Sequence, residues 1–139
     1  MPLEIAFPIE FIVADTPVSL QAKRRQSLDQ WKRQVISASR VALPEGHFAT
    51  ARPISAMLFY FPPTEMPGDI DNIVKPILDA LGGHIYLDDR QVQRVVVQKF
   101  EPEGIFPFAA PSPTLEAALR GAKPVLYVRL SDDPFEELS

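Results

Sequence analysis

The sequence predicts a single α/β (α+β) domain, spanning residues 1–139, in which helices flank a mixed β-sheet. Three observations support this prediction. A chain of 139 residues that is 46% hydrophobic is long enough for one compact core and has the composition of a globular protein. The apolar pattern contains three to five strand-like runs and three helix-like segments. These do not alternate strictly, which favours a mixed sheet over a purely parallel one.

The strand predictions rest on alternation and on β-branched or aromatic content. Residues 54–61 are apolar at nearly every position, as in a central strand covered on both faces. Residues 91–100 and 125–130 are further strands. Residues 3–13 are interrupted by Pro8, so we expect an edge strand or two short extended pieces there.

Three helices are predicted. Ser19 can cap a helix over residues 20–42, whose apolar positions recur at intervals of three and four. A second helix follows the aspartates near residue 70 and ends at Leu81, where Gly82-Gly83 supplies a left-handed cap. Residues 112–120 form a short third helix. Residues 131–139 contain four acids and are expected to be a frayed tail.

Charge is distributed unevenly, although the net charge of the chain is only −4. Residues 20–40 contain six basic residues and one acid, whereas residues 65–89 contain six acids and one lysine. The basic face of the first helix is either a solvated surface or a surface that follows a phosphate backbone. The candidate DNA-binding residues on it are Lys23, Arg24, Arg25, Lys32 and Arg33.

The chain has no cysteine, which excludes disulfides and thiolate metal sites. No apolar stretch approaches membrane-spanning length, and the first residues do not form a secretion signal. We therefore expect a cytoplasmic protein without a membrane partner.

The acidic segment is the candidate catalytic region. Asp69 and Asp71 fall at a helix start, where an aspartate is common simply as a cap, and one of them is expected to cap the helix. Asp71, Lys75 and Asp79 are four residues apart and line one face if the helix continues through Pro76. Such a row is also compatible with a surface ladder of salt bridges.

A second acidic pair, Asp88-Asp89, precedes the strand at 91–100. Crowded carboxylates repel one another unless a cation joins them. Magnesium commonly binds one or two protein carboxylates and completes its coordination with water and substrate phosphate. The pattern therefore predicts phosphate chemistry.

The spacing of these residues resembles that of a known family. The motifs are Asp69-Ile-Asp71-Asn72-x-x-Lys75, then Asp79-Ala-Leu, then Leu87-Asp88-Asp89-x-Gln91-Val92. They are similar to those of the RusA-type Holliday junction resolvases, which are endodeoxyribonucleases. The resemblance is most specific over residues 68–99 and looser over most of the chain.

The resemblance implies a homodimeric nuclease that depends on Mg²⁺, or on Mn²⁺ in its place, and cuts opposed strands of a four-way DNA junction. It implies that Asp69, Asp71 and Asp89 bind metal, that Lys75 is the catalytic lysine and that Asp88 is an accessory metal ligand. Some family members carry arginines just before the first aspartate, but residues 63–68 here contain no base. The basic first helix is then expected to supply the DNA contacts.

Two other functions fit the same residues. A catalytically silent relative would hold branched DNA or a protein partner without cutting. A metal-dependent phosphohydrolase would act on nucleotides without requiring branched DNA.

Overall fold

The computed structural model describes residues 3–19, 25–66, 68–102, 104 and 108–136. These residues form one four-stranded sheet in the order β1-β4-β2-β3, with three α-helices packed against it. The elements are β1 (Ile9–Val13), α1 (Arg25–Ser39), β2 (Ile54–Phe61), α2 (Asp71–Leu81), β3 (Val92–Lys99), α3 (Pro113–Arg120) and β4 (Val125–Ser131). Two short 3₁₀ turns, η1 (Arg40–Ala42) and η2 (Asp89–Gln91), follow α1 and precede β3.

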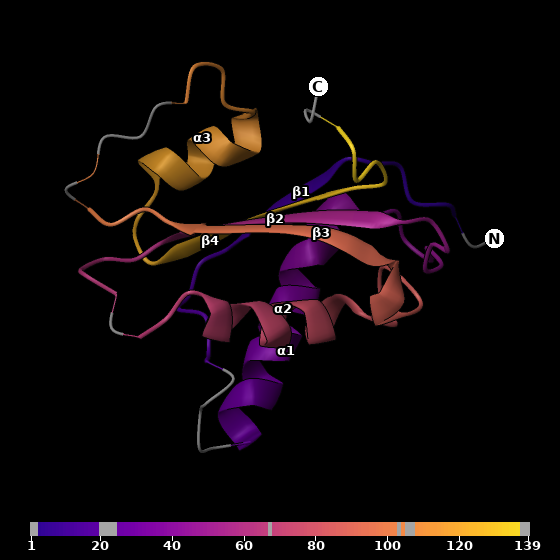
Figure 1. The fold of residues 1–139 in the computed structure, drawn as a ribbon, viewed down its shortest axis with the longest axis horizontal. Helices are drawn as coiled ribbons and strands as arrows, with labels where there is room; N and C mark the ends of the chain where they lie inside the picture. Colours follow the sequence, from indigo (N-terminus) through magenta and orange to yellow (C-terminus); the bar gives the residue numbers. More distant parts are fainter. Residues whose placement is uncertain (1–2, 20–24, 67, 103, 105–107, 137–139) are drawn as a thin grey trace.

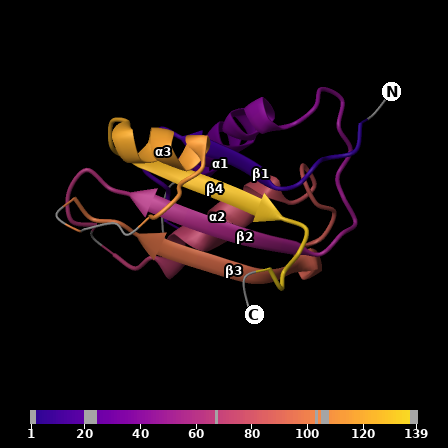
Figure 2. The same ribbon diagram turned by 90° about the horizontal axis from the view of Figure 1, so that it is seen from above.

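The sheet is mixed, as expected. β2 runs parallel to β3 but antiparallel to β4, and β1 is antiparallel to β4 (Figure 2). β4 therefore lies between the first two strands of the chain, and β1 and β3 are the two edges. The edge position of β1 explains why Pro8 is tolerated immediately before it.

Side chains of the central strands alternate between two apolar layers. On one face, Leu58 and Val128 pack with Trp31 of α1 and Ile77 of α2. On the other face, Phe59 and Phe61 pack with the residues of α3 and with Phe100. Figure 1 shows α1 and α2 together below the sheet and α3 above it. Covering both faces of β2 accounts for its nearly continuous apolar sequence.

The parallel pair β2–β3 requires a long crossover connection, and α2 provides it. Gly83, with φ of 82°, takes the left-handed conformation that follows the helix, as predicted for this glycine pair. The crossover places the start of α2 after the end of β2, and η2 before the start of β3.

Three details of the prediction need correction. No aspartate caps α2: the capping position is Ile70, whose backbone is already helical, and no side chain bonds to the first turn. The strand expected over 3–13 is shorter, covering Ile9–Val13. Residues 131–136 are not frayed, because Arg129 pairs with Glu136 and Arg52 pairs with Asp132.

The remaining element predictions are confirmed within the described residues. The expected start of the first helix, in residues 20–24, lies outside them, as do 137–139 of the tail. The end of that helix is a 3₁₀ turn that reaches Ala42. Among the described helices, none is sufficiently long and apolar to cross a membrane.

Candidate active site on the β2–α2–β3 crossover

Lys75 joins the two halves of the acidic motif. Its ammonium lies 2.7 Å from Asp79 Oδ1, one turn further along α2, and 3.2 Å from Asp89 Oδ2, which belongs to η2. Asp89 is fourteen residues away in sequence, so this contact is created by the fold. The sequence placed Lys75 and Asp79 on one helix face, and the structure confirms it.

The helix continues through Pro76. This proline removes a backbone N–H that would otherwise donate to the carbonyl of Asn72. Its ring is buried with Ile73, Ile77 and Ala80 on the side of α2 that faces the core. Apolar packing of that face offsets the lost hydrogen bond, which leaves Lys75 on the solvent side.

Asp69 and Asp71 lie at the other end of the motif. Asp71 is the first residue of α2, one turn before Lys75, which is about 6 Å along the axis. Asp69 precedes the helix, and its carbonyl accepts the N–H of Asn72 at 3.2 Å. Both side chains are exposed. Because neither caps the helix, both carboxylates remain available at the surface.

Asp88 has a structural part in the turn that carries Asp89. Its side chain accepts the N–H of Arg90 and caps η2, while Gln91 completes a capping box. The hydrogen bond from the Arg90 N–H, together with the Arg90 side chain, lowers the pKa of Asp88. Asp88 therefore stays ionised and holds the turn in shape.

Gln91 fixes this turn to the rest of the molecule. Its Oε1 accepts the backbone N–H groups of Leu87 and Asp88, both at 2.8 Å. Its Nε2 donates to the carbonyls of Thr50 and Arg52, also at 2.8 Å. Four hydrogen bonds from one side chain thus define the backbone that presents Asp89.

Tyr86 forms the buried support under the same carboxylates. Its hydroxyl donates to the carbonyl of Leu78 at 2.6 Å. Burial raises its pKa, and the charges of Asp89 and Asp79 raise it further. The phenol therefore remains a protonated donor that locks the turn after α2 against the helix.

The electrostatic state of Lys75 follows from its partners. Hydrogen bonds to Asp79, and then to Asp89, raise its pKa above the usual value. The ammonium is therefore fully charged at neutral pH and is held in one direction. Such a group can bind a phosphate oxygen as a point charge.

Carboxylate oxygens are hard donors of the kind that magnesium prefers, and one or two protein ligands are sufficient for it. Asp69, Asp71 and Asp89 have the appropriate chemistry. Among the described residues, no three histidine, aspartate or glutamate side chains are gathered in a position to hold a metal ion.

A family model decides the relationship that the motif indicated. The model described as Endodeoxyribonuclease RusA matches residues 10–106. The chain belongs to the RusA endodeoxyribonuclease family. The matched RusA region runs from β1 through β3 and includes every candidate catalytic residue. No curated protein matches the chain.

The basic residues expected to contact DNA in this RusA domain are only partly described. Lys23 and Arg24 lie outside the described residues. Arg25 and Arg33 are exposed on α1, and Lys32 is half-buried. None of the ion pairs recorded for the described residues involves these three side chains.

Sequence reasoning gave no site role to three residues of this RusA domain that shape the site: Asp79, Tyr86 and Gln91. Two of them left a signal. Asp79 is four residues after Lys75, and Gln91 is three residues after Asp88, the spacing of a capping box. Tyr86 left no such signal, and only the fold reveals its bond to Leu78.

Proposed function

We propose that this protein is a magnesium-dependent, structure-selective DNA endonuclease that resolves four-way junctions as a homodimer. Family membership implies endodeoxyribonuclease activity and, with it, junction resolution. The observation that carries the proposal is the contact between Lys75 of α2 and Asp89 of η2. It brings the two acidic segments of the motif into contact at an exposed surface.

In this proposal Asp69, Asp71 and Asp89 would hold Mg²⁺, with Asp88 as an accessory ligand, although the described residues do not gather three of these carboxylates in one place. When bound, the ion lowers the pKa of a water ligand and neutralises charge on the phosphate. Lys75 holds a non-bridging oxygen of the scissile phosphate and stabilises the charge that develops there. Asp79 keeps Lys75 oriented, and Gln91 fixes the turn that carries Asp89.

The homodimer follows from the substrate. A four-way junction offers two equivalent strands, and a twofold interface repeats one site on both of them. The exposed cations of α1 supply contacts to the phosphate backbone, so affinity for DNA is expected to fall as salt is added. Two copies of α1 per dimer double this contribution.

The decisive experiment measures cleavage of a synthetic four-way junction with Mg²⁺, with Mn²⁺ and with EDTA. Wild-type protein is expected to release paired nicked products only with the metal. Asp71→Asn keeps the size of the side chain but removes its charge, so it is expected to bind the junction and not to cut it. Equal cutting by Asp71→Asn and wild type would remove Asp71 from the site.

One observation favours a second candidate function. Lys75 neutralises Asp79 and Asp89, and the described residues contain no three-carboxylate group. A catalytically silent branched-DNA-binding module would have this arrangement. It would shift a junction in a gel with the same affinity as the nuclease but give no product at any metal concentration.

A further inference from the structure

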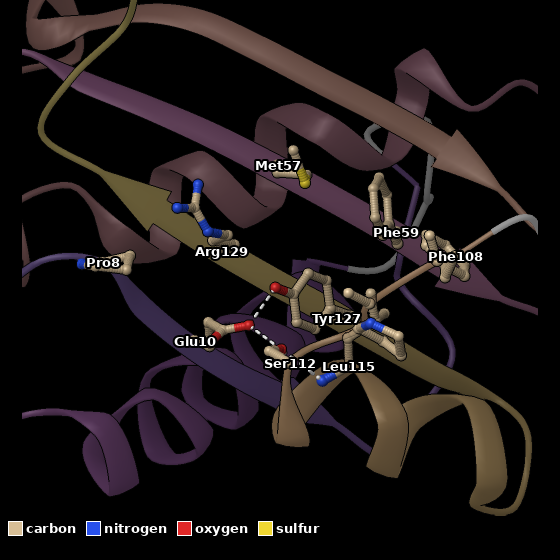
Figure 3. Close-up of a pocket in the computed structure, with 12 residues that line it drawn as sticks. Pro8, Glu10, Met57, Phe59, Phe108, Ser112, Leu115, Tyr127 and Arg129 are labelled. Atoms are coloured by element: carbon tan, nitrogen blue, oxygen red, sulfur yellow. Dashed lines mark hydrogen bonds between the residues drawn. The ribbon is translucent and has the colours of Figure 1, made fainter. Parts of the chain in front are cut away.

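A hollow lies on the sheet face opposite α2, beside α3. Its volume is about 530 Å³, within the range of pockets that hold small organic ligands. Met57 and Phe59 of β2 and Tyr127 of β4 form its floor, and Phe108 and Leu115 form its wall. Figure 3 shows these side chains together with Arg129 and with Glu10, the one carboxylate among the labelled residues, which lies beside Tyr127 and Ser112.

Glu10 is an unexpected residue at this position. β1 alternates between the two faces of the sheet, with Ile9, Phe11 and Val13 buried beneath α1. The same alternation turns Glu10 toward the layer that α3 covers, where its neighbour Ile12 packs against the apolar cluster. Placing a carboxylate in such a layer is unfavourable unless it is hydrogen-bonded.

Two hydroxyls satisfy one oxygen of this carboxylate. Tyr127 and Ser112 each donate to Glu10 Oε2 at 2.5 Å (Figure 3). Ser112 also accepts the N–H of Leu115 as the cap of α3, so its own proton is free to go to Glu10. Both hydrogen bonds recorded for this carboxylate use Oε2, and Glu10 is one of the residues that line the hollow, so Oε1 is the acceptor open to a ligand.

Arg129, the cation opposite Glu10 in the sheet, forms its ion pair with another residue. Glu10 and Arg129 are direct partners across β1 and β4, yet the Arg129 guanidinium pairs with Glu136. That pairing raises the pKa of Arg129 and lowers that of Glu136. Among the ion pairs of the described residues, none includes Glu10. Arg129 also lines the hollow, and its charge interacts with Glu10, but its recorded hydrogen bonds go to Glu136. The hollow therefore combines an aromatic floor with a carboxylate whose recorded hydrogen bonds come from two neutral hydroxyls.

We propose that this hollow binds a small organic cation, an ammonium or amidinium group carried on a flat apolar body. Oε1 of Glu10 accepts the charged donor in a charge-assisted hydrogen bond. The rings of Phe59 and Tyr127, which are stacked with centroids 5.6 Å apart, contact the apolar body. Because α2 and α3 lie on opposite sides of the sheet, this site is separate from the proposed nuclease site (Figure 1).

The test compares two probes of nearly equal shape. Benzamidine carries a cation on a flat ring, and benzamide is its neutral counterpart. Binding is measured by amide chemical shifts of the intact chain, with calorimetry for the affinity. Benzamidine is expected to shift residues of β1, β4 and α3 and to bind at least about tenfold more tightly than benzamide. Equal affinity for both probes, or shifts confined to other surfaces, would overturn the proposal.

A variant isolates the carboxylate. In Glu10→Gln the amide oxygen can still accept from Tyr127 and Ser112, so the packing of α3 is expected to survive, and the benzamidine preference is expected to disappear. Glu116→Gln is the matched control, because it removes the same charge from α3 at the Arg120 pair. Unchanged selectivity in Glu10→Gln would refute the assignment. Should that variant unfold, the comparison of probes on wild type still decides.

Discussion

Lys75 has little to contribute to stability and much to contribute to geometry. The side chain of Lys75 is 51% exposed and that of Asp89 is 61% exposed. Ion pairs with this much exposure add little to the free energy of unfolding. What the pairs accomplish is orientation: Asp79 and Asp89 hold one ammonium between two chain segments. A residue with this profile is expected to affect activity far more than folding.

Replacing Lys75 by methionine tests this difference. Lys75→Met keeps the apolar stem and removes the charge, so cleavage of the junction is expected to fall by about 10²–10³. Its urea midpoint is expected to stay near that of wild type. Arg120→Met is the control, because Arg120 forms a similar exposed pair, with Glu116, on α3 at the other side of the sheet. Retained cleavage in Lys75→Met would exclude a catalytic role for the ammonium.

At the scale of single residues, the sequence was informative where spacing encodes contact. The four-residue interval between Lys75 and Asp79 predicted their ion pair, because helix geometry fixes which residues meet. The capping role assigned to Asp69 or Asp71 was wrong, because the chain enters α2 through Ile70 with backbone turns instead. The site roles of Asp69, Asp71, Asp88 and Asp89 remain predictions.

At the scale of elements, the β2–α2–β3 crossover is the unit that builds the site. Its strands and helix were predictable from periodicity, but the position of η2 against α2 was not. That position depends on Gln91, which bonds to the loop at Thr50 and Arg52, about forty residues away in sequence. No local pattern encodes a bond to a distant loop.

A substitution at Gln91 is therefore expected to disturb the site without touching its carboxylates. Gln91→Leu removes four hydrogen bonds, each of which contributes roughly 0.5–1.5 kcal/mol, and is expected to lower the free energy of unfolding by about 2–6 kcal/mol. Cleavage is expected to fall even at temperatures where the variant is fully folded, because the backbone that carries Asp89 is no longer held in place. Fully folded protein with wild-type cleavage would contradict this account.

Gln93→Leu provides the comparison for Gln91→Leu. Gln93 is exposed on β3, two residues further along the chain, so the same chemical change there lies outside the turn. Its cleavage and its unfolding curve are expected to match those of wild type.

At the scale of the whole molecule, two histidines connect distant segments. The Ser39 hydroxyl donates to the Ile36 carbonyl, so it accepts the Nε2 proton of His84. The Nε2 proton of His47 goes to the His84 carbonyl at 2.8 Å. The end of α1, the following loop and the turn after α2 are thereby joined.

This arrangement predicts a pH dependence of stability. Burial lowers the pKa of His84, and His47 and Arg40 lower it further. The folded state therefore binds fewer protons than the unfolded state, so the free energy of unfolding falls as pH drops from 6.5 through the depressed pKa. Urea unfolding between about pH 5 and 7.5 measures the slope, which is expected to be flatter in His84→Gln. Identical slopes would assign the dependence to other groups.

The order of the strands in the sheet could not be predicted from the sequence. Periodicity identified each strand, and the parallel pair β2–β3 was compatible with the helix between them. Nothing in the pattern of residues 125–130 indicated that this strand would enter between β1 and β2. The acidic tail was misjudged for the same reason, since Glu136 finds Arg129 and Arg94 only after β4 is in place.

The insertion of β4 has a consequence for biosynthesis. Ile9 pairs with Leu130, and the residues matched by the family model end at 106, before β4 begins. When only the family-matched region has left the ribosome, β1 and the β2–β3 pair cannot yet join, because β4, the strand that lies between them, has not been made. Maturation of the nascent enzyme must wait for β4, so the acidic surface cannot be built on its finished scaffold while translation of that strand is still under way.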